Sequence, residues 1–173
     1  MKSLDLSVKM PKLNLDKESD DKTTLSNLIK YDPEFRQLLE SSNYKRLYSY
    51  VDKPGLLTRL LYSLDIDVLS YLESVPKQFL SDQYVPIHVN VPDNIKSLKV
   101  YSFSDSGLLY ISLPATLNYI DRYSFFAVSH LKNIAFKGTK REWNDITKAP
   151  DWISDSTKAN VKVVKCTDGD VKL

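Results

Sequence analysis

A chain of 173 residues has room for one ordinary domain, or for two small ones that share a core. Its 24 basic and 22 acidic side chains leave a formal charge of +2, which disfavours nucleic acid and an anionic membrane surface as partners. The single cysteine, Cys166, excludes an internal disulfide framework and a cysteine-based zinc site, and no apolar run approaches the roughly 18 residues of a membrane span.

Residues 1–22 are expected to form an extended or mobile arm. They contain no aromatic residue and end in a charged run at 16–21, so they have little apolar surface to bury. The stretch also lacks the continuous apolar segment of a secretory signal, which favours a cytoplasmic protein. An arm that binds a partner is the alternative to a solvated tail.

Residues 23–84 are predicted to form a compact α-helical subdomain. Asp32 followed by Pro33 is typical of a helix start, because Asp is a favoured N-cap and Pro fits the first helical position. Apolar residues keep helical spacing from Phe35 to Val51, which carries the helix to an Asp-Lys-Pro-Gly break at 52–55.

Two further amphipathic helices are expected, at 56–64 and 66–75. The helical part is rich in tyrosine, a residue enriched at interfaces, and Tyr44 and Tyr48 are therefore secondary candidates for protein binding. The alternative is that the tyrosines fill a small helical core with their hydroxyls at its rim. Lys45-Arg46 beside them is weak support for stacking with nucleic acid.

From Val89 onward the sequence repeats every 22 residues, and a third strand begins at Ile134 after 23. A fixed period of this size predicts a solenoid whose coils each contain a strand, a turn and a loop. The matching pairs are Val89 and Ile111, Val91 and Leu113, Pro92 and Pro114, Ile95 and Leu117, Leu98 and Ile120, Tyr101 and Tyr123, and Phe103 and Phe125.

This spacing resembles the BspA-like leucine-rich repeats, whose coils read roughly I-P-x-x-(V/I)-x-x-I-x-x-x-A-F. The stretch "FKGTKREWNDI", at 136–146, is similar to the terminator of such arrays, and "VKVVKCTDGDV", at 161–171, is similar to the tail that follows it. The resemblance covers residues 87–171. The frame is occupied here by Pro92, Ile95, Leu98, Phe103, Leu108 and Ile111, and again by Pro114, Leu117, Ile120, Phe125, Leu131 and Ile134.

The expected fold is α+β: a helical N-terminal subdomain that caps a short leucine-rich-repeat solenoid at residues 85–173. Each coil buries its apolar face only against a neighbour, so both ends of the array need covers. We expect Trp143 and Ile146 to cover the last coil, with a strand at 161–164 beside Phe136.

Catalysis has little support in the sequence. His88 is expected on a strand, His130 in a loop and Cys166 near the far end, so a solenoid would keep them apart. The acidic loops at 105–107 and 168–170 lack the ligand count of a calcium site, and "GTK" at 138–140 lacks phosphate-loop spacing. We therefore expect no enzyme, cofactor or metal.

The most plausible function is protein binding through the outward face of the strands. Side chains alternate along a strand, so residues that flank the inward apolar positions must face out. Stacking the coils predicts two outward rows, one of His88, Tyr110 and Asn133 and the other of Asn90, Ser112 and Ala135. Two other functions stay open: a structural subunit of a larger assembly, and an intracellular inhibitor or effector, for example from a phage or mobile element, that occludes a host enzyme.

Overall fold

The computed structural model describes residues 30–41, 43–49, 55, 57–58, 61, 68–81 and 87–173. The chain divides into two compact units, Met1–Lys53 and Pro54–Leu173. This boundary lies at the Asp-Lys-Pro-Gly break, whereas the sequence placed the end of the helical part at residue 84. The predicted arm at 1–22 lies outside the described residues.

Over residues 33–49 the structure shows two short helices where the apolar spacing predicted one. Helix α2 (Pro33–Glu40) begins as expected, since the Asp32 carboxylate accepts hydrogen bonds from the backbone N–H groups of Glu34 and Phe35 at 3.0 Å each. Ser41 ends α2, and Asn43 starts α3 (Tyr44–Ser49) by accepting from the Arg46 N–H through its side chain. The caps at Ser41 and Asn43 therefore divide into two helices the segment for which the apolar spacing predicted a single helix.

In the second unit the helix predicted at 66–75 is wrong. Residues Val68–Tyr71 form the 3-10 helix η1, and Ser74–Val75 form strand β1, which pairs in parallel with β3 (Ser97–Leu98). The Asn94 side chain donates to the carbonyl oxygens of Leu69 and Leu72, which fastens η1 to the next stretch of chain. The apolar residues of this stretch fit either an α-helix or a 3-10 helix followed by a strand. Pairing with the neighbouring strand β3 favours the second structure.

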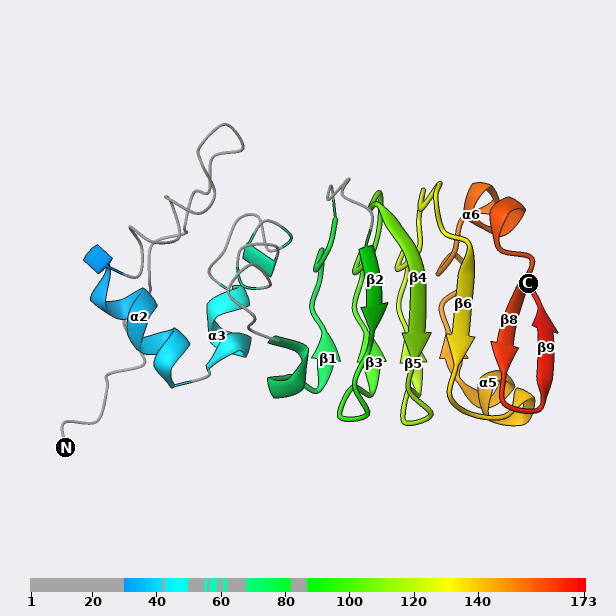
Figure 1. Ribbon diagram of the computed structural model, residues 1–173, viewed down its shortest axis with the longest axis horizontal. Coiled ribbons are helices and arrows are strands. Elements are labelled where there is room, and N and C mark those ends of the chain that lie inside the picture. The colour runs from blue at the N-terminus through cyan, green and yellow to red at the C-terminus, as the bar shows by residue number, and fades with distance from the viewer. Residues whose placement is uncertain are drawn as a thin grey trace. The chain divides into compact units, whose positions relative to one another are not determined.

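Two parallel sheets form the body of the second unit (Figure 1), and we call one strand from each with the joining loops a coil. Successive coils contribute neighbouring strands, and among the described strands only β9 is antiparallel to its neighbour. The four-stranded sheet contains β1, β3, β5 (Tyr119–Ile120) and β7 (Thr147–Lys148), in that order. The five-stranded sheet contains β2 (Ile87–Asn90), β4 (Leu108–Leu113), β6 (Asn133–Phe136), β8 (Val163–Cys166) and β9 (Gly169–Lys172).

The strand register confirms the period that the sequence predicts. Val89 lies beside Ile111, and Ile111 beside Ile134, so the spacing of 22 and then 23 residues is the spacing of hydrogen-bonded neighbours. The expected inward residues are buried, and they are Val89, Val91, Ile111, Leu113, Ile134 and Phe136.

A third set of cross-coil hydrogen bonds runs through the turns after β3 and β5. The N–H groups of Tyr101, Phe103 and Asp105 donate to carbonyl oxygens of the next coil at 3.2, 3.0 and 2.8 Å. Tyr101 and Asp105 have φ angles of 58° and 51°, a left-handed conformation that residues other than glycine rarely adopt. The same conformation recurs 22 residues later at Tyr123 and Ala127, so it belongs to the repeat.

Aromatic rings form a column through the interior, which we call the inner column. Phe103 meets Phe79 edge to face and stacks on Phe125 with ring centroids 5.4 Å apart, and Phe125 meets Trp152 at 5.7 Å. All four rings are buried. Neighbouring coils thus bury their largest side chains against one another, which ties the stability of each coil to the next.

Two short helices follow β6. Helix α5 (Lys140–Asp145) opens with a capping box between Thr139 and Glu142, and it buries Trp143 against Phe136 with ring centroids 5.4 Å apart. Ile146 is also buried, and β8 pairs with β6 at Ile134 and Ala135.

Helix α6 (Asp155–Asn160) is fastened to the turn of the third coil through one buried hydroxyl. The Thr157 Oγ1 atom accepts from the Val128 N–H at 3.1 Å and donates to the Phe125 carbonyl at 2.9 Å. The hydroxyl therefore satisfies two buried backbone groups.

Candidate protein-binding face

The outward face of the five-stranded sheet carries the two rows that the sequence predicts. His88 pairs with Tyr110, and Tyr110 with Asn133, which sets the aromatic row. Asn90 pairs with Ser112, and Ser112 with Ala135, which sets the small row. The two rows are two residues apart on each strand, and residues at this spacing face the same side of a sheet. Their side chains therefore lie on one continuous surface.

Tyr110 is the most prominent member of the aromatic row. It is 40% exposed at the middle of the aromatic row, and its ring meets that of His88 edge to face with centroids 4.7 Å apart. The neighbour contact restricts the rotamers of both rings, so little conformational entropy would be lost if a partner covered them.

The Asn133 side-chain oxygen ends the aromatic row as an unused acceptor. This atom is buried, and no described residue donates a hydrogen bond to it. A buried polar atom without a partner costs free energy, so a donor that reached it would bind favourably.

The small row continues into charged residues that the sequence reasoning missed. Ala135 pairs with Lys165 of β8, and Lys165 pairs with Asp170 of β9; both side chains are exposed. They were missed because 30 residues separate Ile134 from its neighbour Val164, so β8 falls outside the period. The face is therefore aromatic near β2 and β4 and charged near β9.

The tyrosine-rich helices offer less surface than expected. Tyr44 is 4% exposed and belongs to the core of the first unit with Phe35 and Leu47, so it is corrected from a binding candidate to a core residue. Tyr48 is half-buried. The large exposed tyrosines of the described helical segments are Tyr31 and Tyr71.

Arg122 and Asp151 form an ion pair beside Tyr123. Arg122 donates to both Asp151 oxygens, at 3.2 Å from Nε to each and 3.0 Å from Nη2 to Oδ2. This hydrogen bonding lowers the pKa of Asp151, and hydrogen bonding to Asp151 raises the pKa of Tyr123. The guanidinium also lies 5.6 Å from the Tyr123 ring.

Residues that could carry chemistry are dispersed. His88 lies on β2 and Cys166 on β8, while His130 lies in an exposed turn with its Nδ1 3.2 Å from the Ser129 hydroxyl. Burial raises the pKa of the Cys166 thiol, and the charges of Asp168 and Asp170 add to the effect, which disfavours the nucleophilic thiolate. Among the described residues, no cluster of three histidine, cysteine or acidic side chains could hold a metal ion.

In the part of the chain that the structure describes, no helix has the length and apolar character needed to cross a membrane. The cytoplasmic location expected from the sequence remains a prediction.

Residues 65–147 match a family model described as "BspA type Leucine rich repeat region (6 copies)". The match begins before the stretch at 87 from which the resemblance was read, because η1 and β1 belong to the first coil. It includes the terminator at 136–146 and stops short of the tail at 161–171. No curated protein and no solved structure matches the chain. The family match and the observed strand register agree, and the repeat region of this chain belongs to the BspA-type leucine-rich repeats.

Proposed function

We propose that this protein is a protein-interaction module and that the aromatic and small rows form its binding surface. The observation that carries the proposal is the placement of Tyr110, an exposed ring held against His88 in the middle of the aromatic row. Tyrosine anchors of this kind supply much of the free energy of protein association, and the adjoining small row would let a partner approach closely.

We further infer that the coils form a short solenoid. Sequential parallel pairing in both sheets supports the solenoid. Repeat proteins of this type are typically non-enzymatic, and the dispersal of His88, His130 and Cys166 supports the same conclusion for this chain.

The experiment is an affinity capture from a lysate of the native organism with four versions of the protein. These are the wild type, Tyr110→Ala, Ala135→Glu, and Tyr71→Ala as the matched control. Tyr71 is a tyrosine of comparable exposure that lies on η1, away from both rows. Proteins that bind through the face should be captured by the wild type and by Tyr71→Ala and lost from the other two.

The captured protein is then purified and titrated by calorimetry. Tyr110→Ala should weaken binding by about 2 kcal/mol, or roughly 30-fold in Kd, and the charge at Ala135→Glu should block docking. Unaltered binding in both variants would exclude the sheet face. A single stoichiometric enzyme as partner would favour the inhibitor function, and a set of assembly components would favour the structural one.

A further inference from the structure

The five-stranded sheet has an open edge at β9. Among the described strands β9 is the last in the order of that sheet, and Figure 1 shows it at the outer border with β8 on its other side. An edge strand presents backbone N–H and C=O groups with which a further strand can pair. The side chains of β9 therefore determine which strand can join the sheet there.

The hydrogen bonds to β8 identify the residues of β9 that are directed to the open edge. The Leu173 N–H donates to the Lys162 carbonyl oxygen at 3.1 Å, so the backbone of Leu173 is directed toward β8. Successive residues of an antiparallel strand direct their backbone groups to opposite sides. Val171 is therefore also directed toward β8, whereas the N–H and C=O groups of Asp170 and Lys172 are directed to the open edge.

The two residues directed to the edge carry opposite charges. Asp170 and Lys172 are two positions apart on β9, so their side chains lie on the same face of the sheet, and both are exposed. Among the described residues, neither side chain has an ion-pair partner. The edge therefore carries one negative and one positive group beside its unpaired backbone.

This order of charges makes the edge complementary to itself. In an antiparallel register centred on Val171, Asp170 of one copy lies opposite Lys172 of a second copy, and two-fold symmetry repeats the pair. Registers that keep the backbone hydrogen bonds differ by two residues, and a shift in either direction places Asp170 opposite Asp170 or Lys172 opposite Lys172. A parallel arrangement in register brings both kinds of like charge together. Like charges directly opposite each other are destabilising, so the register centred on Val171 is favoured over these alternatives.

The same register satisfies the backbone and buries apolar surface. Each pair of Asp170 and Lys172 exchanges both of its N–H···O=C hydrogen bonds, because these are the groups directed to the edge. Val171 lies on the inward face, since it pairs with the buried Val164. It is half-buried in the single chain, and contact with Val171 of the second copy removes more of its surface from water.

We propose that two copies of this chain associate through β9 in the antiparallel register centred on Val171. The two five-stranded sheets then form one continuous sheet whose two-fold axis is perpendicular to it. Both copies present their aromatic and small rows on the same side, which permits bivalent binding of a partner. The strand contact is short, so the association is weak and depends on protein concentration.

Sedimentation equilibrium of the full chain measures this association. A range from about 10 μM to about 1 mM suits an interface of less than about 1,200 Å². The average mass should rise with concentration toward that of two chains. A mass that stays at that of a single chain over the whole range would overturn the proposal.

Charge variants test the pairing of the edge. Asp170→Lys and Lys172→Asp should each weaken association by about tenfold or more, because each places like charges opposite each other at both pairs. Glu73→Lys makes the same change in charge as Asp170→Lys on an exposed residue of the first coil, and it should leave association unchanged. Tyr110→Ala should also leave it unchanged, so failure of the sheet-face proposal and failure of this one are distinguishable.

A mixture of the two edge variants separates lost pairing from lost folding. When Asp170→Lys and Lys172→Asp are combined, opposite charges again face each other at both pairs. The mixture should therefore form dimers that contain one copy of each variant, although neither associates well alone. Circular dichroism checks that each variant is folded, and folded variants that fail to associate when mixed would contradict the proposal.

Disulfide trapping tests the register. Paired residues at the position of Val171 have Cα atoms about 4.5 Å apart, within the reach of a disulfide. In a chain that carries Cys166→Ser, oxidation of Val171→Cys with copper phenanthroline should therefore give a covalent dimer. Asp170→Cys in the same background should not, because the two equivalent residues lie beyond the roughly 7 Å limit between Cα atoms. Equal cross-linking of the two variants, or cross-linking of Asp170→Cys alone, would exclude this register.

Discussion

The inner column and the aromatic row each contain one side chain from every coil that they cross. They differ in whether the residue type is kept from coil to coil. Every position of the inner column holds a large aromatic residue, from Phe79 through Phe103 and Phe125 to Trp152. The aromatic row changes from His88 to Tyr110 to Asn133 although its backbone register is just as regular. Packing restricts the buried positions to one kind of side chain, and the exposed positions are free to differ where recognition requires it.

The largest expected effect is at the inner column. Phe125→Ala should lower the free energy of unfolding by about 3–5 kcal/mol, because Phe125 is fully buried between Phe103 and Trp152 and its loss leaves a cavity. Urea denaturation followed by circular dichroism measures the change.

Phe126→Ala is the matched control for that measurement. It removes the same ring one residue further along the chain, where the side chain is 45% exposed and touches Tyr123 only edge to face. The cost should be about 1 kcal/mol or less. Equal losses for the two variants would contradict the assignment of inner and outer positions.

A smaller effect is expected at α5, the short helix between β6 and β7. Thr139→Ala should cost about 1 kcal/mol, because the Thr139 hydroxyl caps α5 by accepting from the Glu142 N–H, and α5 holds Trp143 in the core. Arg141→Ala, an exposed substitution in the same helix, should leave thermal stability nearly unchanged. Comparable losses in the two variants would show that helix propensity, and not the cap, sets the effect.

The aromatic row should contribute less to the free energy of unfolding than the inner column or the α5 cap. Tyr110→Ala should lower the free energy of unfolding by only about 0.5 kcal/mol, although it removes a ring as large as that of Phe125. Most of this loss comes from the edge-to-face contact with His88. The same substitution should therefore cost much less in a protein that already carries His88→Ala. A double-mutant cycle by chemical denaturation measures this coupling, and a loss near that of Phe125→Ala would place Tyr110 in the core instead of on a binding face.

The strand register, the inward residues and the aromatic row could be predicted from the sequence because they obey a period. Each match between the stretches from Val89 and Ile111 constrains every neighbouring position, so a single alignment places a whole coil. The helix start at Asp32 could be predicted for another reason, since Asp before Pro specifies an N-cap locally.

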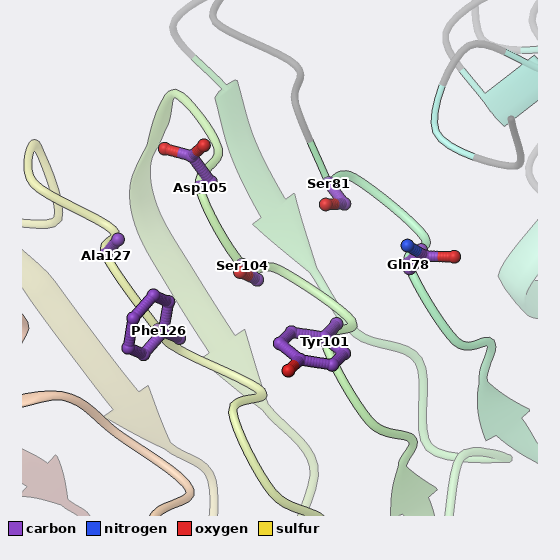
Figure 2. A pocket seen from close by; sticks show the side chains of 7 residues that line it. All are labelled: Gln78, Ser81, Tyr101, Ser104, Asp105, Phe126 and Ala127. Atoms are coloured by element: carbon purple, nitrogen blue, oxygen red, sulfur yellow. The ribbon is translucent and has the colours of Figure 1, made fainter.

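Features that depend on contacts between distant residues could not be predicted in this way. The stretch at 66–75 has helical spacing, but its state is decided by pairing of Ser74 with Ser97 and by the Asn94 side chain. Ser81, Ser104 and Phe126 help to line one surface pocket (Figure 2) because the turns of successive coils lie side by side. Residues in these turns adopt left-handed backbone conformations. Lys165 joined the small row only through a strand outside the period.

The smallest effect concerns pH and separates the end of the array from its interior. The inner column contains no ionisable group, so mild acid should act first at charged sites such as the α5 cap. There the Glu142 carboxylate accepts from the Thr139 N–H at 2.7 Å, and these hydrogen bonds lower the pKa of Glu142 from 4.5. Because the folded-state pKa is depressed, the stabilisation is fully present above the unfolded pKa and is lost as pH falls through the folded one. The difference in Tm between the wild type and Glu142→Gln should therefore be constant near neutral pH and shrink below pH 4.5.

Asp145→Asn is the control for this measurement. It removes a carboxylate at the C-terminal end of the same helix, where negative charge is unfavourable, so it should not lower the Tm at neutral pH. A difference for Glu142→Gln that stays constant into the acid range would mean that the capping contact is indifferent to the charge of Glu142.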